Sequence, residues 1–83
     1  MAWFVYLLRC KGNTLYTGIT TDTERRLEAH RRGLASRYTR ARLPVSLVYH
    51  EPQPTRSQAL KREAEIKRLR RAAKLELIRT GEG

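Results

Sequence analysis

The chain has 83 residues, which is enough for one small hydrophobic core and excludes a second lobe or an elaborate buried cofactor site. Its 18 lysine and arginine residues stand against 8 acidic residues and give a formal net charge of +10. So high a charge on so small a chain predicts a polyanionic partner, and nucleic acid is the first candidate.

The apolar run near the N-terminus and the cysteine count indicate the cellular compartment. The apolar run over residues 3–8 is much shorter than the roughly 20 residues that a membrane-spanning helix needs, and it lacks the pattern of a signal peptide. Cys10 is the only cysteine, so we expect a small buried strand residue and no internal disulfide or cysteine-based zinc cluster. We expect a cytoplasmic protein that binds no membrane and forms a single domain over residues 1–83.

The first two expected elements are the strands of a β-hairpin. Residues 3–9 and 14–20 are rich in aromatic and β-branched side chains, as strands are. Between them, Gly12 and Asn13 best tolerate the positive φ of a short loop. Tyr6 and Tyr16 are predicted to face the same side of the sheet. From the hairpin alone, two ordinary sheet tyrosines are the simpler interpretation.

The next segment predicts a helix. Thr21 is followed three residues later by Glu24, which has the form of a capping box, and Gly33 stands where a glycine often follows the end of a helix. The helix is therefore expected to run to about residue 32. The basic segment over residues 34–42 is expected to be irregular, with room for one short helical turn.

One face of this helix carries candidate site residues. Arg26 and His30 are spaced by one helical turn and share their face with Leu27, which is expected to face the sheet. A guanidinium and an imidazole are therefore expected at the edge of the core. Arg25, one step around the helix, is expected to be more exposed.

The remaining sequence predicts one strand and two helices. Residues 44–50 alternate as a strand, with Val45, Leu47 and Tyr49 on one face, and the two prolines at 52 and 54 predict a turn directly after it. A helical pattern begins at residue 55, and a second short helix follows it. The predicted fold class is α+β, a small three-stranded antiparallel sheet flanked by helices in the order β-β-α-β-α-α.

Glu63 is the candidate metal ligand. Its carboxylate emerges beside the apolar stripe of the helix that begins near residue 55, where a buried charge needs a partner or a cation. Glu65 lies among basic residues on a more solvated face, where ordinary helix ion pairs explain it.

Together these segments resemble the GIY-YIG nuclease family over essentially the whole chain. The family's first motif corresponds to Phe4-Val5-Tyr6 and its second to Tyr16-Thr17-Gly18. Arg26 falls eight residues after that glycine, His30 four residues later, and residues 59–63 resemble the segment with the family's metal-binding glutamate. Phe4, Val5 and Thr17 stand where the family has glycine or isoleucine.

The resemblance implies a divalent-metal-dependent endonuclease that hydrolyses phosphodiester bonds in DNA, of structured or damaged form, as in DNA repair. It implies one Mg²⁺ or Mn²⁺ ion per site, held by Glu63, and no small-molecule cofactor. Tyr6 is then the general base, with a pKa lowered by nearby positive charge, and Arg26 grips a phosphate oxygen. Tyr16 bonds the nucleophile or the phosphate, and His30 orients groups or assists proton transfer.

Nucleic-acid contacts are expected from a basic footprint around this site. The residues we select for it are Gly18, Arg25, Arg37, Tyr38, Arg40 and Lys67. Gly18 is expected to let its strand pass close to the helix or to the phosphate backbone, and Tyr38 to stack on bases. Two alternatives stay open: a noncatalytic DNA- or RNA-binding module on the same fold, and a small structural protein of a ribonucleoprotein.

Overall fold

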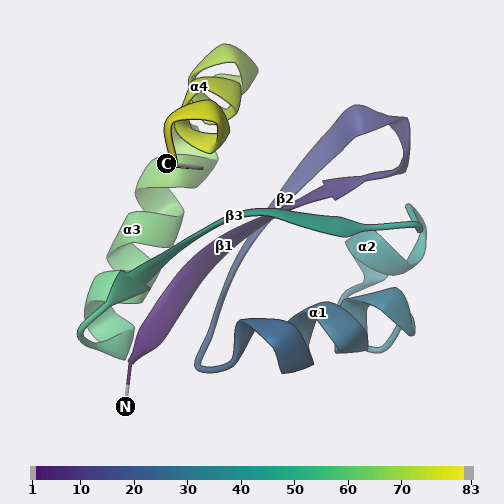
Figure 1. The fold of residues 1–83 in the computed structure, drawn as a ribbon, viewed down its shortest axis with the longest axis horizontal. Helices are drawn as coiled ribbons and strands as arrows, with labels where there is room; N and C mark the ends of the chain where they lie inside the picture. The colour runs from purple at the N-terminus through teal and green to yellow at the C-terminus, as the bar shows by residue number, and fades with distance from the viewer. Residues whose placement is uncertain (1, 82–83) are drawn as a thin grey trace.

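The structure, a computed structural model, describes residues 2–81 and forms a three-stranded antiparallel sheet between two layers of helices (Figure 1). The elements in chain order are β1 (Trp3–Cys10), the 3-10 turn η1 (Lys11–Asn13), β2 (Thr14–Thr20), α1 (Thr23–Arg31), α2 (Arg37–Arg40), β3 (Ser46–Gln53), α3 (Arg56–Arg68) and α4 (Arg71–Gly81). The predicted α+β class is confirmed, and α2 is the short helical turn expected within residues 34–42. None of the helices in residues 2–81 is long and apolar enough to cross a membrane.

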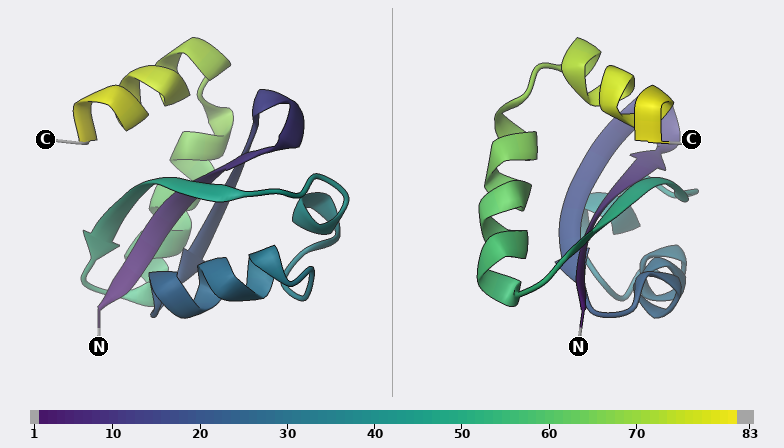
Figure 2. Two further views of the ribbon diagram at one scale, coloured as in Figure 1. Left: turned by 45° about the vertical axis from the view of Figure 1, so that its right-hand side comes forward. Right: turned by 60° about the vertical axis from the view of Figure 1, so that its left-hand side comes forward.

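The central strand is β1, because the sheet order is β2-β1-β3 and both pairings are antiparallel. Figures 1 and 2 show α3 on one side of the sheet and α1 on the other. With both faces covered, residues 5–8 of β1 are all buried, which explains why this stretch of the sequence is apolar without alternation.

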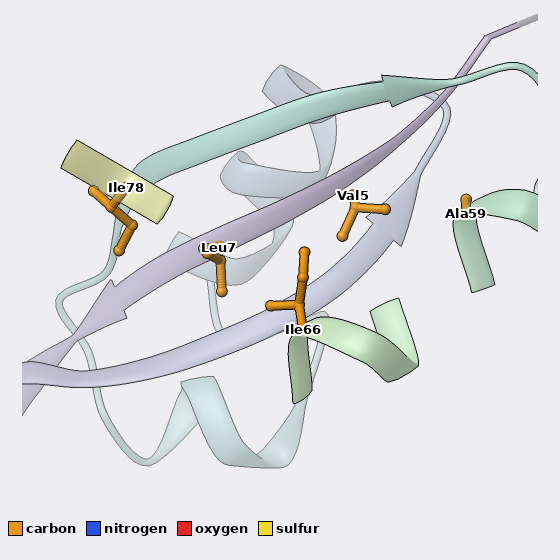
Figure 3. Packing of buried hydrophobic residues seen from close by; sticks show 5 residues of the cluster. All are labelled: Val5, Leu7, Ala59, Ile66 and Ile78. Carbon is orange, nitrogen blue, oxygen red and sulfur yellow. The ribbon is translucent and has the colours of Figure 1, made fainter. Parts of the chain in front are cut away.

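Two hydrophobic clusters fill the two layers. On one face, Val5 and Leu7 pack with Ala59 and Ile66 of α3 and with Ile78 of α4 (Figure 3). On the other face, the buried members are Tyr6, Leu8, Cys10 and Val45, and the partly buried ones around them include Tyr16, Leu27 and Tyr38. Alternate side chains of β1 therefore belong to different clusters, and Tyr6 lies on the face covered by α1 and α2.

The start of α1 differs from the prediction by one residue. Asp22, not Thr21, is the N-cap, and its carboxylate accepts a hydrogen bond from the backbone N–H of Arg25 at 3.1 Å. Aspartate caps at least as well as threonine, and the chain leaving β2 needs one further residue to turn into the helix. The end of α1 is as predicted, since Gly33 has a φ of 74°.

The prediction that the third strand ends before its prolines is wrong. β3 continues to Gln53 and includes Pro52, which pairs with Phe4. Proline is tolerated there because β3 is an edge strand and has a neighbour on one side only. The predicted shared face is also wrong, because the register with β1 shifts between Leu7 and Leu8 and places Leu47 and Tyr49 in different clusters.

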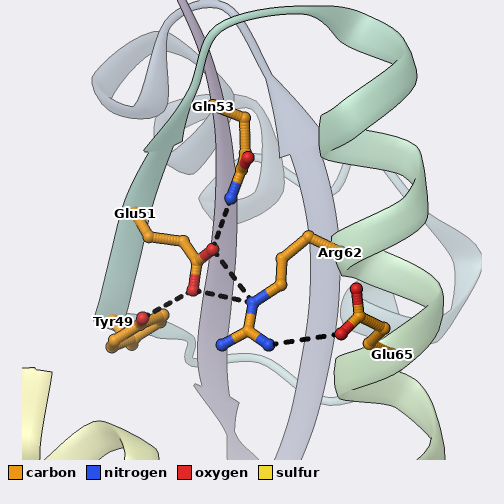
Figure 4. Close-up of polar contacts among 5 residues, drawn as sticks. All are labelled: Tyr49, Glu51, Gln53, Arg62 and Glu65. Atoms are coloured by element: carbon orange, nitrogen blue, oxygen red, sulfur yellow. Dashed lines mark hydrogen bonds and ion pairs between the residues drawn. The ribbon is translucent and has the colours of Figure 1, made fainter.

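A polar clamp fixes α3 to β3 (Figure 4). The Nε atom of Arg62 donates to both carboxylate oxygens of Glu51, at 3.1 and 3.0 Å. The same carboxylate accepts hydrogen bonds from the Tyr49 hydroxyl at 2.6 Å and from the Gln53 amide at 2.7 Å. Because Arg62 directly precedes Glu63, this clamp restrains the rotation of α3 at the point where the candidate metal ligand emerges.

Candidate active site

The two tyrosines of the hairpin lie on one face of the sheet, with ring centroids 6.4 Å apart. Tyr6 pairs directly with Gly18, and a Cβ atom at Gly18 would lie 2.5 Å from the Tyr6 hydroxyl oxygen. The close approach at Gly18 is therefore made by the Tyr6 ring, not by the helix that the sequence suggested. Glycine is needed at this position because the phenol lies across the backbone of β2.

His30 joins the tyrosines from α1. Its Nε2 atom is 2.8 Å from the Tyr6 hydroxyl oxygen, and its ring centroid is 5.1 Å from that of Tyr16 in an edge-on arrangement. The imidazole is fully buried, because Leu27 on the same face of α1 packs against the sheet. The predicted meeting of Tyr6, Tyr16 and His30 thus has a direct hydrogen bond at its centre.

Thr39 is a site residue that sequence reasoning missed. Its hydroxyl lies 2.8 Å from the Nδ1 atom of His30, so both ring nitrogens of the imidazole have a partner. Thr39 comes from α2 and is fully buried. The only signal in the sequence was a threonine in a segment that has no clear periodicity, and nothing local indicates that it faces α1.

Burial makes both members of the Tyr6–His30 pair harder to ionise. It raises the pKa of Tyr6 to about 12, with smaller increases from the Tyr16 and Glu63 charges, while the Arg26 guanidinium acts in the opposite direction. Burial, followed by repulsion from Arg26, lowers the pKa of His30 to about 4. Both groups are therefore neutral at neutral pH, and the protein's own side chains do not give Tyr6 the lowered pKa that a free phenolate base requires.

Arg26 brings an unsatisfied donor to the same place. Its Nε atom is buried and has no hydrogen-bond partner among residues 2–81. A buried donor without a partner costs about 1–3 kcal/mol, so a bound anion would relieve a cost already present in the protein. Beside it lies a hollow of about 260 Å³ lined by Thr20, Thr21, Asp22, Arg25, Arg26 and Ala29.

Glu63 comes from α3, on the opposite side of the sheet from α1, and lies near enough for its charge to act on Tyr6 (Figure 2). Its side chain is only 18% exposed, and the Lys67 ammonium lies 3.5 Å from it. Within residues 2–81 no three His, Cys, Asp or Glu side chains gather as a metal site, so a cation at Glu63 would take most of its ligands from water and phosphate oxygens. That donor set suits Mg²⁺ or Mn²⁺, which keep water and phosphate ligands, and does not suit zinc. Glu65 is exposed and pairs with Arg62, as the sequence suggested.

The residues predicted to contact nucleic acid divide into two groups. Arg25, Arg37 and Arg40 are exposed and able to approach a phosphate backbone, and Lys67 is exposed but paired with Glu63. Tyr38 is half-buried, with the Arg42 guanidinium 3.8 Å from its ring centroid and the Tyr16 ring 5.9 Å away. Its ring forms part of the wall around the site, which leaves little of it for base stacking.

Comparisons with known proteins extend over nearly the whole chain. The family model of the GIY-YIG catalytic domain matches residues 2–76. UPF0213 proteins of Staphylococcus aureus strains Mu3 / ATCC 700698 and N315 are each 50% identical over 76 residues, which cover 92% of this chain and 93% of theirs. The solution NMR structure of a UPF0213 protein from Bacillus halodurans is 40% identical, with a TM-score of 0.64, and the match covers 100% of this chain and 88% of that one.

Proposed function

Because the chain belongs to the GIY-YIG family, whose catalytic domains are nuclease-like, we propose that it is a divalent-metal-dependent endonuclease that hydrolyses phosphodiester bonds in DNA. The observation that carries this proposal is the 2.8 Å hydrogen bond between Tyr6 and His30 beside the unpaired, buried Nε atom of Arg26. A proton acceptor and an anion-binding group therefore lie together just below the surface of a strongly basic protein, beside the hollow at the start of α1.

The Tyr6–His30 pair supplies general base catalysis. An attacking water must lose a proton as its oxygen approaches phosphorus. Tyr6 accepts that proton on its oxygen while its own proton passes to Nε2 of His30, and the electron pair of the broken O–H bond stays on the Tyr6 oxygen. Tyr6 is neutral before and after this exchange, so a pKa of about 12 is compatible with its role.

Arg26 and Tyr16 bind the reacting phosphate. A guanidinium fork can hold a non-bridging oxygen through charge-assisted hydrogen bonds, and these strengthen as negative charge accumulates in the transition state. Tyr16 lies within the same ring cluster and directs its hydroxyl to the phosphate or to the water. Both residues act on the oxygens around phosphorus, where the charge of an in-line displacement develops.

Glu63 would hold the metal ion, Mg²⁺ or Mn²⁺, as its one protein ligand. When bound, such a cation supplies positive charge to the phosphoryl oxygens and offsets the Glu63 charge that raises the pKa of Tyr6. With a single carboxylate the affinity without DNA is expected to be weak. Lys67, now 3.5 Å from Glu63, would be released to contact the substrate backbone.

The substrate class is argued from charge and shape. A net charge of +10 and the exposed Arg25, Arg37 and Arg40 favour a phosphate backbone in extended contact. The protein is small, and the hollow beside Arg26 lies at the start of α1. We propose that it acts on structured or damaged DNA in the cytoplasm, in which the scissile strand is accessible.

Cleavage of labelled single-stranded, duplex and branched DNA with Mg²⁺, Mn²⁺ or EDTA tests the proposal. Tyr6→Phe should reduce cleavage by roughly 10²- to 10⁴-fold, the usual worth of a general base. Glu63→Gln should abolish the response to metal, while its matched control Glu65→Gln, on the same helix but exposed, should cleave like the native protein. Absence of cleavage on every substrate, with salt-sensitive binding retained, would replace the nuclease by a noncatalytic nucleic-acid-binding module.

A further inference from the structure

We infer that Thr39 is a positioning residue whose hydroxyl selects the tautomer of His30 in which Nδ1 carries the proton and Nε2 is free to accept one from Tyr6. The purpose of this arrangement rests on the proposed function, because it prepares His30 for the proton transfer described above. The tautomer itself is a property of the folded protein and can be measured without any nuclease activity.

Four polar groups from three elements form one buried chain. The Tyr6 hydroxyl of β1 is 2.8 Å from Nε2 of His30 in α1, and Nδ1 of the same ring is 2.8 Å from the Thr39 hydroxyl of α2. The Thr39 hydroxyl in turn donates to the carbonyl oxygen of Ser36 at 3.3 Å. Tyr6, His30 and Thr39 are at most 2% exposed, so these groups must satisfy one another.

With the proton on Nδ1, every donor in this chain has an acceptor. The Nδ1–H group donates to the Thr39 oxygen, the Thr39 O–H donates to the Ser36 carbonyl, and the Tyr6 O–H donates to the lone pair of Nε2. Three protons meet three acceptors, and none of these buried donors is left without a partner.

With the proton on Nε2, one buried donor is left without an acceptor. Nε2–H would then donate to the Tyr6 oxygen, and the Thr39 hydroxyl would turn to donate to Nδ1. The Tyr6 proton would lose its acceptor, because Nε2 of His30 is the one acceptor in contact with the Tyr6 hydroxyl within residues 2–81 and the neighbouring Arg26 has only donors. The Ser36 carbonyl would lose the Thr39 hydrogen bond but would still accept from the backbone N–H of Arg40 at 2.9 Å. The main cost of this tautomer is therefore the Tyr6 proton that has no acceptor.

The favoured tautomer is also the one that can accept a proton. Only an unprotonated Nε2 offers Tyr6 a lone pair, so a ring with the other tautomer would block the transfer. When the proton arrives, the Nδ1–H group continues to donate to Thr39, and the hydrogen bond strengthens because the ring is now charged. Thr39 therefore orients the acceptor before the reaction and stabilises the imidazolium after it, without contacting substrate.

Nitrogen NMR of protein labelled with ¹⁵N in histidine tests this, because the shift of each ring nitrogen reports whether it carries a proton. In the native protein near pH 7 we expect His30 to be protonated at Nδ1 and not at Nε2. Thr39→Val, which replaces the hydroxyl by a methyl group, should shift the tautomer ratio toward Nε2–H by about tenfold, the worth of one hydrogen bond. Thr39→Ser should restore the native ratio.

A matched control is available in Thr17→Val, which also removes a buried threonine hydroxyl but from β2, next to the opposite cluster. It should leave the His30 signals unchanged. In the cleavage assay, Thr39→Val should lower kcat by about tenfold or more with little change in KM, and Thr39→Ser should recover most of the loss.

Two results would overturn the inference: a native protein with its proton on Nε2, or a folded Thr39→Val protein with the native tautomer ratio. If Thr39→Val fails to fold, the spectrum of the native protein still shows which ring nitrogen of His30 carries the proton, and Thr39→Ser then serves as the second variant. If the native protein cleaves nothing but shows the Nδ1–H tautomer and the expected response to Thr39→Val, the nuclease proposal fails and the role of Thr39 in setting the tautomer stands.

Discussion

The buried His30 should make the stability of this protein depend on pH in a way that one substitution removes. Burial and then the Arg26 charge lower the pKa of His30 from 6.5 to about 4, so the folded protein binds this proton less readily than the unfolded chain does. The stability that the neutral ring contributes is therefore fully present above pH 6.5. It is lost as the pH falls from 6.5 toward 4, where the folded state also takes up the proton.

The size of the effect follows from the same pKa. At about 1.36 kcal/mol per pKa unit, the whole change amounts to about 3 kcal/mol, and about 2.5 kcal/mol of it should be lost by pH 4.5. For a domain of this size, whose total stability is on the order of 5–10 kcal/mol, this is a large fraction. Carboxylates also titrate in this range, so the prediction concerns the difference between the native protein and a variant.

Urea denaturation at several pH values between 7 and 4.5 measures this difference. His30→Gln should flatten the dependence of the unfolding free energy on pH by about 2.5 kcal/mol over this range. His50→Gln is the matched control, because His50 is exposed on β3, and its curve should run parallel to the native one. A His30→Gln protein whose curve also runs parallel to the native one would refute the assignment of a neutral, buried imidazole.

Three further predictions concern the surroundings of the site. Gly18→Ala would place a methyl group 2.5 Å from the Tyr6 hydroxyl oxygen and should cost about 1–3 kcal/mol in urea denaturation; unchanged stability would contradict the close approach. Glu51→Gln weakens the clamp on Arg62 and should cost about 1–2 kcal/mol, whereas Glu65→Gln should stay within about 0.5 kcal/mol of the native protein. Binding to duplex DNA should show a log-log salt slope of about −5 if roughly six phosphates are neutralised, and a slope near zero would exclude the basic footprint as the binding surface.

Much of the site was predictable because its geometry is local. Alternation along β1 and β2 places Tyr6 and Tyr16 on one face, and the helical period places Arg26 and His30 together on α1. The glycine at position 33 and its positive φ mark the end of that helix. Each of these relations depends on residues within one element or one hairpin, where the sequence pattern and the local structure have the same period.

The parts that were not predictable depend on contacts between elements. Thr39 reaches His30 only because α2 packs under the end of α1, and a helix of four residues has too few positions to show a period. Pro52 lies in a strand because β3 is at the edge of the sheet, which is a property of the topology and not of the local sequence. The raised pKa of Tyr6 likewise follows from burial beneath α1.

The charges around Tyr6 and His30 suggest that His30 becomes a good proton acceptor only when substrate is bound. Burial keeps both groups neutral, and the Arg26 guanidinium further disfavours an imidazolium at His30. Under the proposed function, a phosphodiester bound by Arg26 brings a negative charge that offsets this repulsion, so His30 becomes a better proton acceptor when the scissile phosphate is in place. Since Tyr6 is neutral at the start and end of the exchange, the basicity of His30 is the quantity that substrate binding must raise. An Arg26→Lys protein keeps the positive charge but loses the planar guanidinium fork. It should therefore keep Tyr6 and His30 neutral in the absence of substrate while binding the phosphate less well.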